Sequence, residues 1–141
     1  MILYLDTSAL VKVYVVEIAT DLVRGEAAKA KILVTSVVAY AETRSAFDRR
    51  CRSGHLSAHE FSRVKSEFEE HWPSFETVIV DDQRARRAGE LAEAHRLKGF
   101  DAVHLASADY FQTTLGPVTF ACFDAELSRA ARSCGMALLS S

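Results

Sequence analysis

Short apolar runs alternate along this chain with longer segments in which hydrophobic residues recur every three or four positions. Runs of the first kind predict buried strands over 2–5, 32–35, 77–80, 118–123 and 136–139. Segments of the second kind predict helices over 9–16, 19–30, 37–52, 57–71, 82–96, 100–114 and 125–133. Ser57 and Glu60 have the spacing of a capping box, and Gly54 and Pro73 are typical of helix ends.

This alternation predicts an α/β fold, an α/β/α sandwich around a mostly parallel sheet of about five strands. The 141 residues fit a single domain spanning 1–141, and the sequence shows no internal repeat or linker. In such sheets ligands bind beyond the carboxyl ends of the strands, where the strand order reverses. The residues that follow each strand are therefore the first place to look for a site.

Composition narrows the class of protein. Hydrophobic residues make up 49% of the chain and charged residues 26%, which argues against disorder. No apolar run reaches the roughly 18 residues of a membrane span, and no basic segment precedes the first apolar run as in a secretory signal. Cys51, Cys122 and Cys134 are an odd number without close pairing, which fits a reducing compartment. We therefore expect a cytoplasmic protein without membrane contact.

Four acidic residues stand where an unpaired carboxylate would be costly. Asp6 follows the first predicted strand and Asp124 the fourth, so both should lie at the carboxyl edge of the sheet. Glu42 has apolar neighbours on its helix, and Asp101 begins a helix that is apolar nearly all round. Each also has an ordinary interpretation: the three aspartates stand at helix starts, where carboxylates cap, and Glu42 could pair with a nearby arginine.

Carboxylates gathered in one pocket repel each other unless a cation compensates. Mg²⁺ prefers oxygen ligands and often binds through few carboxylates and a substrate phosphate. Acids without histidine or cysteine at matched spacing favour Mg²⁺ or Mn²⁺ over zinc. The sequence therefore predicts a magnesium or manganese site, which can lower the pKa of a bound water and neutralise charge on a phosphate. Its ligands would be Asp6, Glu42, Asp101 and Asp124.

Two histidine-containing patterns are weaker candidates. Cys51, His55 and His59 are spaced by four, but Gly54 should break the helix between them, so a zinc site is disfavoured. His104 follows Asp101 by one helical turn and could touch the acidic site. A structural role inside a buried helix is the simpler interpretation for a lone histidine among apolar residues.

Two phosphate-handling classes are also disfavoured. A haloacid-dehalogenase-like phosphatase needs a second acid two residues after the first, where this chain has Ser8. A phosphate-receiver domain would need paired acids near the amino terminus and a lysine after a late strand. Asp81 and Asp82 instead follow the third predicted strand, and no suitable lysine comes after Lys98.

Four segments, YLDTSALVKVY, SVVAYAETRSAF, LKGFDAVHLASA and FACFDAELSRAA, together resemble the PIN-domain ribonucleases, and most closely the VapC toxins of toxin–antitoxin pairs. The resemblance runs over essentially the whole chain and implies a PIN-like fold. In that family a quartet of acids binds one or two Mg²⁺ or Mn²⁺ ions, and a metal-activated water hydrolyses an RNA phosphodiester. The matching positions here are Asp6, Glu42, Asp101 and Asp124.

The residues around the quartet follow the same resemblance. Thr7 or Ser8 would orient a ligand or a phosphate beside the first acid. We also expect Thr7 and Ser8 to begin the first helix, which would free the Asp6 carboxylate for the ion. Cys122 departs from the pattern, because many relatives carry threonine or serine at that place.

The resemblance further implies an RNA substrate (transfer or ribosomal RNA in relatives), a small VapB-type antitoxin whose tail crosses the acidic pocket, and a homodimer. The first helix and the region 37–61 are candidates for the protein contacts. The net charge of −2 argues against a protein that coats RNA by bulk positive charge. The candidates for contact with the RNA backbone are instead Arg84, Arg86 and Arg87, because guanidinium groups suit phosphate oxygens. Salt bridges on an exposed helix face are the simpler explanation for these arginines. The alternative function is a non-catalytic acidic binding module, which the presence of all four acids disfavours.

Overall fold

The computed structural model describes residues 1–139 and contains one five-stranded, wholly parallel sheet of order β3-β2-β1-β4-β5. The strands are β1 (Ile2–Leu5), β2 (Ile32–Ser36), β3 (Glu76–Val78), β4 (Val118–Ala121) and β5 (Ala137–Leu138). The central strand β1 pairs with both β2 and β4, so the strand order reverses there. The predicted α/β fold with a parallel sheet is confirmed, and the reversal marks the edge where a site is expected.

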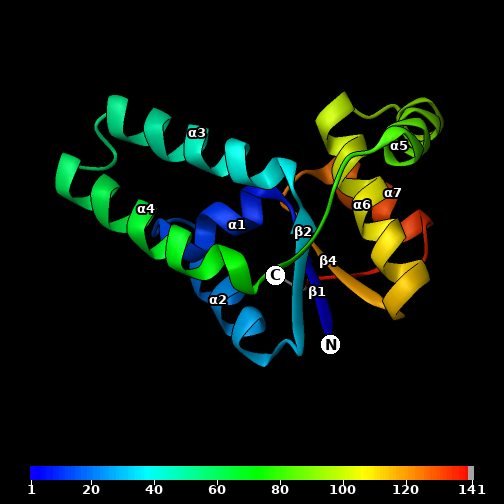
Figure 1. The fold of residues 1–141 in the computed structure, drawn as a ribbon, viewed down its shortest axis with the longest axis horizontal. Helices are drawn as coiled ribbons and strands as arrows, with labels where there is room; N and C mark the ends of the chain where they lie inside the picture. Colours follow the sequence, from blue (N-terminus) through cyan, green and yellow to red (C-terminus); the bar gives the residue numbers. More distant parts are fainter. Residues whose placement is uncertain (140–141) are drawn as a thin grey trace.

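Helices cover both faces of this sheet (Figure 1). One face carries α1 (Thr7–Tyr14), α2 (Thr20–Lys29), α3 (Val38–Arg52) and α4 (Ala58–His71). The other face carries α5 (Asp82–His95), α6 (Gly99–Leu115) and α7 (Ala125–Ser133). Among residues 1–139, no helix has both the length and the apolar character that a membrane crossing requires.

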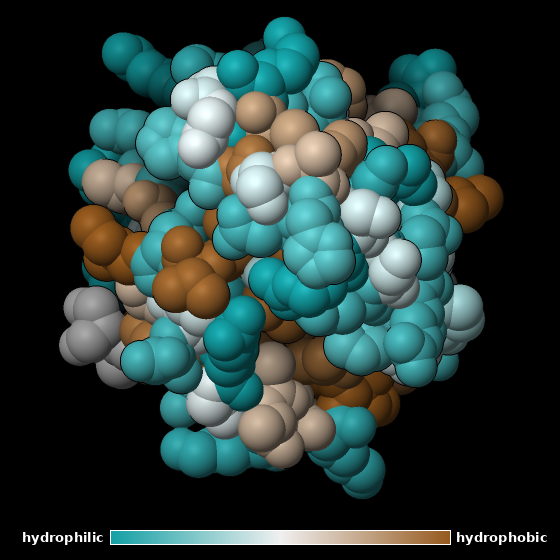
Figure 2. Space-filling model, turned by 90° about the vertical axis from the view of Figure 1, so that its left-hand side faces the viewer, coloured by the Kyte–Doolittle hydropathy of each residue, from teal (hydrophilic) through white to brown (hydrophobic). Residues whose placement is uncertain are grey.

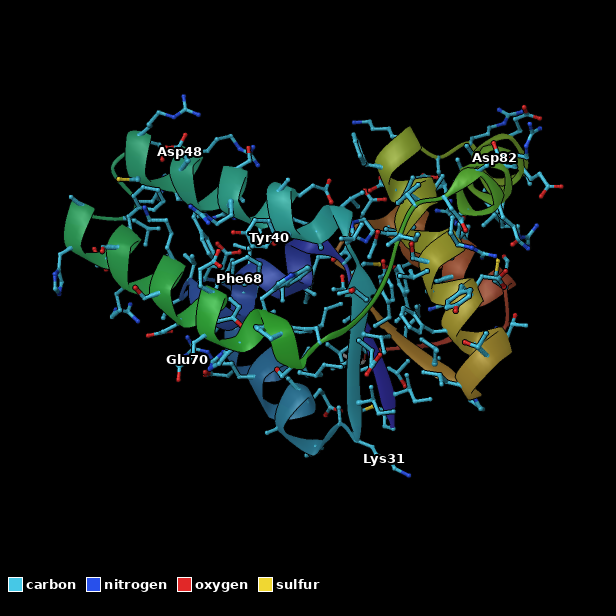
Figure 3. The ribbon with its side chains drawn as sticks, viewed as in Figure 1. Lys31, Tyr40, Asp48, Phe68, Glu70 and Asp82 are labelled. Atoms are coloured by element: carbon cyan, nitrogen blue, oxygen red, sulfur yellow. The ribbon has the colours of Figure 1, made fainter. Side chains whose placement is uncertain are left out.

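The alternation of side chains along β1 divides the core into two halves. Leu3 and Leu5 are buried on the side of α1 to α4, whereas Tyr4 is buried on the other side and stacks on Phe120 of β4. On the first side, Tyr40 of α3 stacks on Phe68 of α4, with their ring centroids 5.6 Å apart (Figure 3). Because Leu3, Tyr4 and Leu5 are buried on both faces of the sheet, the run of apolar residues in β1 is unbroken.

Strand ends depend on the neighbouring strand as well as on the apolar run. The predicted strands 77–80 and 118–123 are too long, because β3 pairs only with Val34–Ser36 and β4 stops beside the end of β1. Two residues therefore separate β4 from Asp124, which was expected to follow that strand directly. The helix predicted over 57–71 begins as expected, since Ser57 and Glu60 form the capping box. After it, a 3₁₀ turn (Trp72–Ser74) contains Pro73.

Helix α1 is a core element. Its residues Ala9, Leu10, Val11 and Tyr14 are at most 2% exposed, so its apolar face already has partners within the chain. These four side chains are therefore not available to a partner, and a partner contact by the first helix stays a prediction. The face at the α3–α4 end is largely hydrophilic, with its hydrophobic side chains in separate patches (Figure 2).

Candidate active site

The four predicted acids line a single pocket of about 300 Å³ at the carboxyl edge of the sheet. Asp6 follows β1, and Asp124 lies between β4 and α7. Glu42 lies near the start of α3, and Asp101 in the first turn of α6, where the two helices approach each other beside the sheet (Figure 1). Chain segments far apart in sequence thus meet at the predicted edge.

Asp6 both caps α1 and faces the pocket. Its Oδ1 accepts a hydrogen bond from the Ser8 hydroxyl at 2.7 Å and another from the Ala9 amide at 2.9 Å. Thr7 and Ser8 begin α1 as expected, but Asp6 supplies the cap, so the expectation that its whole carboxylate is freed is wrong. A carboxylate has two oxygens, and Oδ2 of Asp6 accepts no hydrogen bond from residues 1–139.

In Asp124 and Glu42 too, one carboxylate oxygen accepts hydrogen bonds and the other accepts none from residues 1–139. Oδ2 of Asp124 caps α7 by accepting the Leu127 amide at 2.9 Å, which leaves Oδ1 without a partner among the described residues. Oε1 of Glu42 accepts from Thr7 and from His104, which leaves Oε2. Each acid of the quartet thus keeps at least one oxygen that no described protein group uses.

The electrostatics of the pocket disfavour four bare charges. Burial raises the pKa of Asp6. Burial and then the charge of Asp124 raise the pKa of Asp101. No lysine or arginine in residues 1–139 forms an ion pair with any of the four acids. A cation from outside the chain would relieve this repulsion.

Glu42 behaves differently, because hydrogen bonds stabilise its charge. Burial alone would raise the pKa of this carboxyl, but the donors His104 and Thr7 outweigh burial and the pKa is lowered. The Thr7 hydroxyl donates to Oε1 at 2.6 Å, and Nε2 of His104 lies 2.8 Å from the same oxygen. The surroundings therefore favour the charged form of Glu42, whereas they oppose the charged forms of Asp6 and Asp101.

The donor set fits a hard, hydrated divalent ion. All four acids offer oxygen, and the neighbouring hydroxyls of Thr7 and Ser8 hold carboxylates in place. No three acidic, histidine or cysteine side chains within residues 1–139 are arranged closely enough to hold an ion directly. Mg²⁺ does not need such a cage, since it keeps several waters and binds through one or two carboxylates plus substrate oxygens.

His104 is the pocket residue that the sequence interpretation undervalued. Its side chain is 2% exposed, as expected for a histidine inside a buried helix, yet it also lines the pocket and contacts Glu42. Its position three residues after Asp101 places both on one face of α6, and that spacing is the signal that could have identified it.

The arginines predicted to meet RNA lie outside this pocket, in a groove between α5 and α6. Arg86 pairs with Asp82, which Figure 3 places on α5, at 2.8 Å. Arg87 pairs with Asp109 at 3.3 Å. Only Arg84 of the three lacks a carboxylate partner among the described residues; its guanidinium lies 4.9 Å from the centre of the Tyr110 ring.

A different arginine lies beside the acids. A second hollow shares Thr7 and Glu42 with the acidic pocket and is also lined by Ala41, Ser45 and Arg49. Arg49 Nη1 donates to the Ser45 hydroxyl at 2.8 Å and forms no ion pair within residues 1–139. The acidic pocket therefore opens along α3 toward an uncommitted positive charge.

Cys122 is half-buried beside α7. Its sulfur lies 3.1 Å from the Ser128 hydroxyl, and burial raises the pKa of the thiol to about 11. The thiol is therefore neutral near pH 7 and contributes no charge to the four acids.

The sequence of the chain is similar to that of known proteins. A model of the PIN domain matches residues 3–133. Two ribonucleases of Mycobacterium tuberculosis are similar in sequence: VapC45 of strain CDC 1551 / Oshkosh and VapC49 of strain ATCC 25618 / H37Rv. Each is 34% identical over 107 residues, which is 76% of this chain and 74% of the relative.

Solved structures share the fold at lower identity. FitAcB from Neisseria gonorrhoeae superposes with a TM-score of 0.68 at 18% identity, covering 99% of this chain and 97% of that one. VapBC2 from Rickettsia felis, bound to a DNA fragment from their promoter, gives 0.66 at 15% identity, covering 98% and 97%. PAE2754 from Pyrobaculum aerophilum gives 0.64 at 16%, covering 97% and 83%.

Proposed function

This chain belongs to the PIN-domain family, and on that premise we propose that it is a VapC-type endoribonuclease toxin that hydrolyses RNA phosphodiester bonds with Mg²⁺ or Mn²⁺. One observation carries the proposal. Acids from separate elements share one pocket, each keeps a free oxygen, and no lysine or arginine in residues 1–139 forms an ion pair with them. A non-catalytic binding module would have no need to keep four costly carboxylates together.

The residues of the pocket have distinct roles in this proposal. Asp6, Glu42, Asp101 and Asp124 would hold the ion, directly or through its waters. When bound, the ion supplies an activated water and neutralises charge that develops on the phosphate. Thr7 and Ser8 hold Glu42 and Asp6 in place, so we assign them to the orientation of carboxylates.

The substrate path follows from the free charges around the pocket. A phosphate beside the acids could reach Arg49 through the adjoining hollow, and a planar guanidinium suits phosphate oxygens. Arg84, without a carboxylate partner among the described residues, remains a candidate for a more distant phosphate. Arg86 and Arg87 would have to break their ion pairs with Asp82 and Asp109 before they could bind a phosphate.

The partner would be a small antitoxin. The structures of VapBC2 from Rickettsia felis and of FitAB, each bound to a DNA fragment, share this fold, which supports a VapB-type protein as the neutralising partner. The unbalanced acids offer one place for its attachment, because a basic side chain laid across them would relieve the same repulsion as a metal ion. A homodimer is part of the proposal by family resemblance.

The test is cleavage of RNA by the purified chain in Mg²⁺ or Mn²⁺, compared with Asp6→Asn and Asp101→Asn variants. In both variants the rate of RNA cleavage should fall by more than the roughly 10–100-fold that is typical of removing an outer-shell partner of a metal ligand. Asp82→Asn is the matched control, since it removes an exposed acid of α5 outside the pocket and should cleave at the parent rate.

Two results would contradict the proposal. Cleavage by the Asp101→Asn variant at the parent rate would exclude the acidic pocket as the catalytic centre. Absence of cleavage by the parent chain across total cellular RNA, with either ion, would favour the binding module. If cleavage occurs, sequencing the new RNA ends would identify the substrate.

A further inference from the structure

A chain of hydrogen bonds runs from the buried sheet into the acidic pocket through His104. The imidazole Nδ1 lies 2.7 Å from the hydroxyl of Tyr4, a residue of β1 that is fully buried. The opposite nitrogen, Nε2, lies 2.8 Å from Oε1 of Glu42 and 3.2 Å from the Thr7 hydroxyl. Both ring nitrogens therefore form hydrogen bonds, Nδ1 with a core residue and Nε2 with residues of the acidic pocket.

The direction of each hydrogen bond follows from its partners. An ionised Glu42 can only accept, so Nε2 carries the proton that is donated to it. Nδ1 of a neutral imidazole then has no proton and accepts from the Tyr4 hydroxyl. Tyr4 remains a donor because burial raises the pKa of its phenol well above the ordinary value. The pair thus fixes the tautomer as well as the ring orientation of His104.

The consequence for Glu42 is a carboxylate with one oxygen fixed. Donors from two other helices, Thr7 of α1 and His104 of α6, converge on Oε1 of a side chain that belongs to α3. The side chain of Glu42 is 29% exposed and would otherwise be free to change rotamer. With Oε1 held on both sides, Oε2 is the oxygen available to a ligand in the pocket.

We propose that His104, held by Tyr4, is a positioning residue that presents Oε2 of Glu42 to the divalent ion and thereby sets the affinity of the pocket for that ion. The inference rests on the proposed function, since it requires a cation among the acids. It differs from a purely structural role, because a core histidine needs only satisfied nitrogens and would leave metal affinity unchanged.

The first measurement needs no metal. Nitrogen NMR of the metal-free chain labelled at histidine should show His104 as the Nε2–H tautomer. Tyr4→Phe should weaken this preference, because it removes the donor to Nδ1 while keeping the ring that stacks on Phe120. The neutral Nδ1–H tautomer in the parent chain would overturn the inference, since its Nε2 has no proton to donate to Glu42.

The second measurement is the dissociation constant for Mn²⁺, followed by the electron paramagnetic resonance signal of the free ion. His104→Leu removes the donor and should weaken Mn²⁺ binding roughly 10–100-fold, the usual effect of losing an outer-shell partner. His104→Gln can place an amide N–H near the position of Nε2 and should recover part of the affinity. Leu91→Ala is the matched control, because it disturbs the same half of the core from α5, and Leu91 does not line the acidic pocket.

A double-mutant cycle shows whether His104 acts through Glu42. In a Glu42→Gln background, adding His104→Leu should change the Mn²⁺ constant by less than about twofold, because the group that His104 orients has lost its charge. Weakening of the same size in both backgrounds would overturn the positioning role.

The remaining outcomes separate this inference from the proposed function. If the parent chain binds Mn²⁺ and folded His104→Leu binds it equally well, the positioning role is overturned while the metal site stands. If His104→Leu does not fold, Tyr4→Phe decides, and it should weaken Mn²⁺ binding while Leu91→Ala does not. If the parent chain does not bind Mn²⁺ at all, both the metal site and the positioning role are overturned.

Discussion

Asp6 and Ala9 are joined by a 2.9 Å hydrogen bond from the Ala9 amide to Oδ1 of Asp6, which caps helix α1 from inside the acidic pocket. One oxygen of this carboxylate therefore stabilises the start of α1, and the other is available to a ligand. Asp124 repeats this arrangement with Leu127 at the start of α7. Substitutions at either acid affect two properties, and the choice of replacement separates them.

Asp6→Ala should destabilise the chain, whereas Asp6→Asn should not, although both should abolish cleavage. Alanine loses the cap, which costs about 0.5–2 kcal/mol in the free energy of unfolding, while the asparagine carbonyl still accepts from Ala9. Asparagine also removes a charge that burial opposes. Urea denaturation of the three proteins without metal checks this. Equal stability of both variants would show that Oδ1 does not cap.

The sequence predicted the sheet and the location of the pocket, because both follow from local patterns and from the strand-end rule. It did not predict that Asp6 caps α1 with one carboxylate oxygen while the other faces the pocket, because the sequence does not show which oxygen of a carboxylate makes which contact. It also missed the bond between Glu42 and His104, which are 62 residues apart and meet only through packing. The burial of the apolar face of α1 was not predicted, because an apolar helix has the same sequence pattern whether it lies in the core or at an interface.

Mg²⁺ or Mn²⁺ should stabilise the folded chain, because an ion that binds only the native state adds free energy by mass action. At an ion concentration 100 times the dissociation constant, the gain is about 2.7 kcal/mol. Thermal unfolding with and without the chloride salt of each ion checks this, with NaCl matched for ionic strength. Asp101→Asn should reduce the shift, and a shift of parental size in this variant would place the ion elsewhere.

Without metal, the charge of Asp101 should cost stability as the pH rises. Burial and then Asp124 raise the pKa of Asp101 in the folded chain above its ordinary value of 3.8. A carboxyl with a raised folded pKa contributes stability that is fully present below the unfolded pKa and is lost as the pH rises through the folded pKa.

Asp101→Asn should therefore be more stable than the parent at neutral pH, with the difference closing as the pH falls to about 4. Urea denaturation in EDTA across this pH range measures the difference directly. Asp101 accepts no hydrogen bond from residues 1–139, so the substitution removes charge without removing a cap. A difference that grows toward low pH would contradict the prediction.

Thr43→Val should leave the chain equally or more stable, by up to about 1 kcal/mol. Thr43 is fully buried on α3, and its hydroxyl has no hydrogen-bond partner among the described residues. A methyl group of the same shape removes an unsatisfied polar group at no cost in packing. Thr35→Val is the matched control, because its buried hydroxyl donates to the Leu5 carbonyl at 2.7 Å and its loss should cost about 1–3 kcal/mol. Equal losses in the two variants would contradict the assignment of Thr43 as unsatisfied.

Arg49→Gln should weaken RNA binding more than Arg86→Gln, because Arg49 adjoins the acids without a carboxylate partner in residues 1–139 while Arg86 is paired with Asp82. Binding is measured with the Asp6→Asn variant, so that cleavage does not interfere, at several salt concentrations. Each lost phosphate contact should lower the slope of log affinity against log salt by about 0.7 for single-stranded RNA. A slope changed by Arg84→Gln and unchanged by Arg49→Gln would move the RNA path from α3 to the groove between α5 and α6.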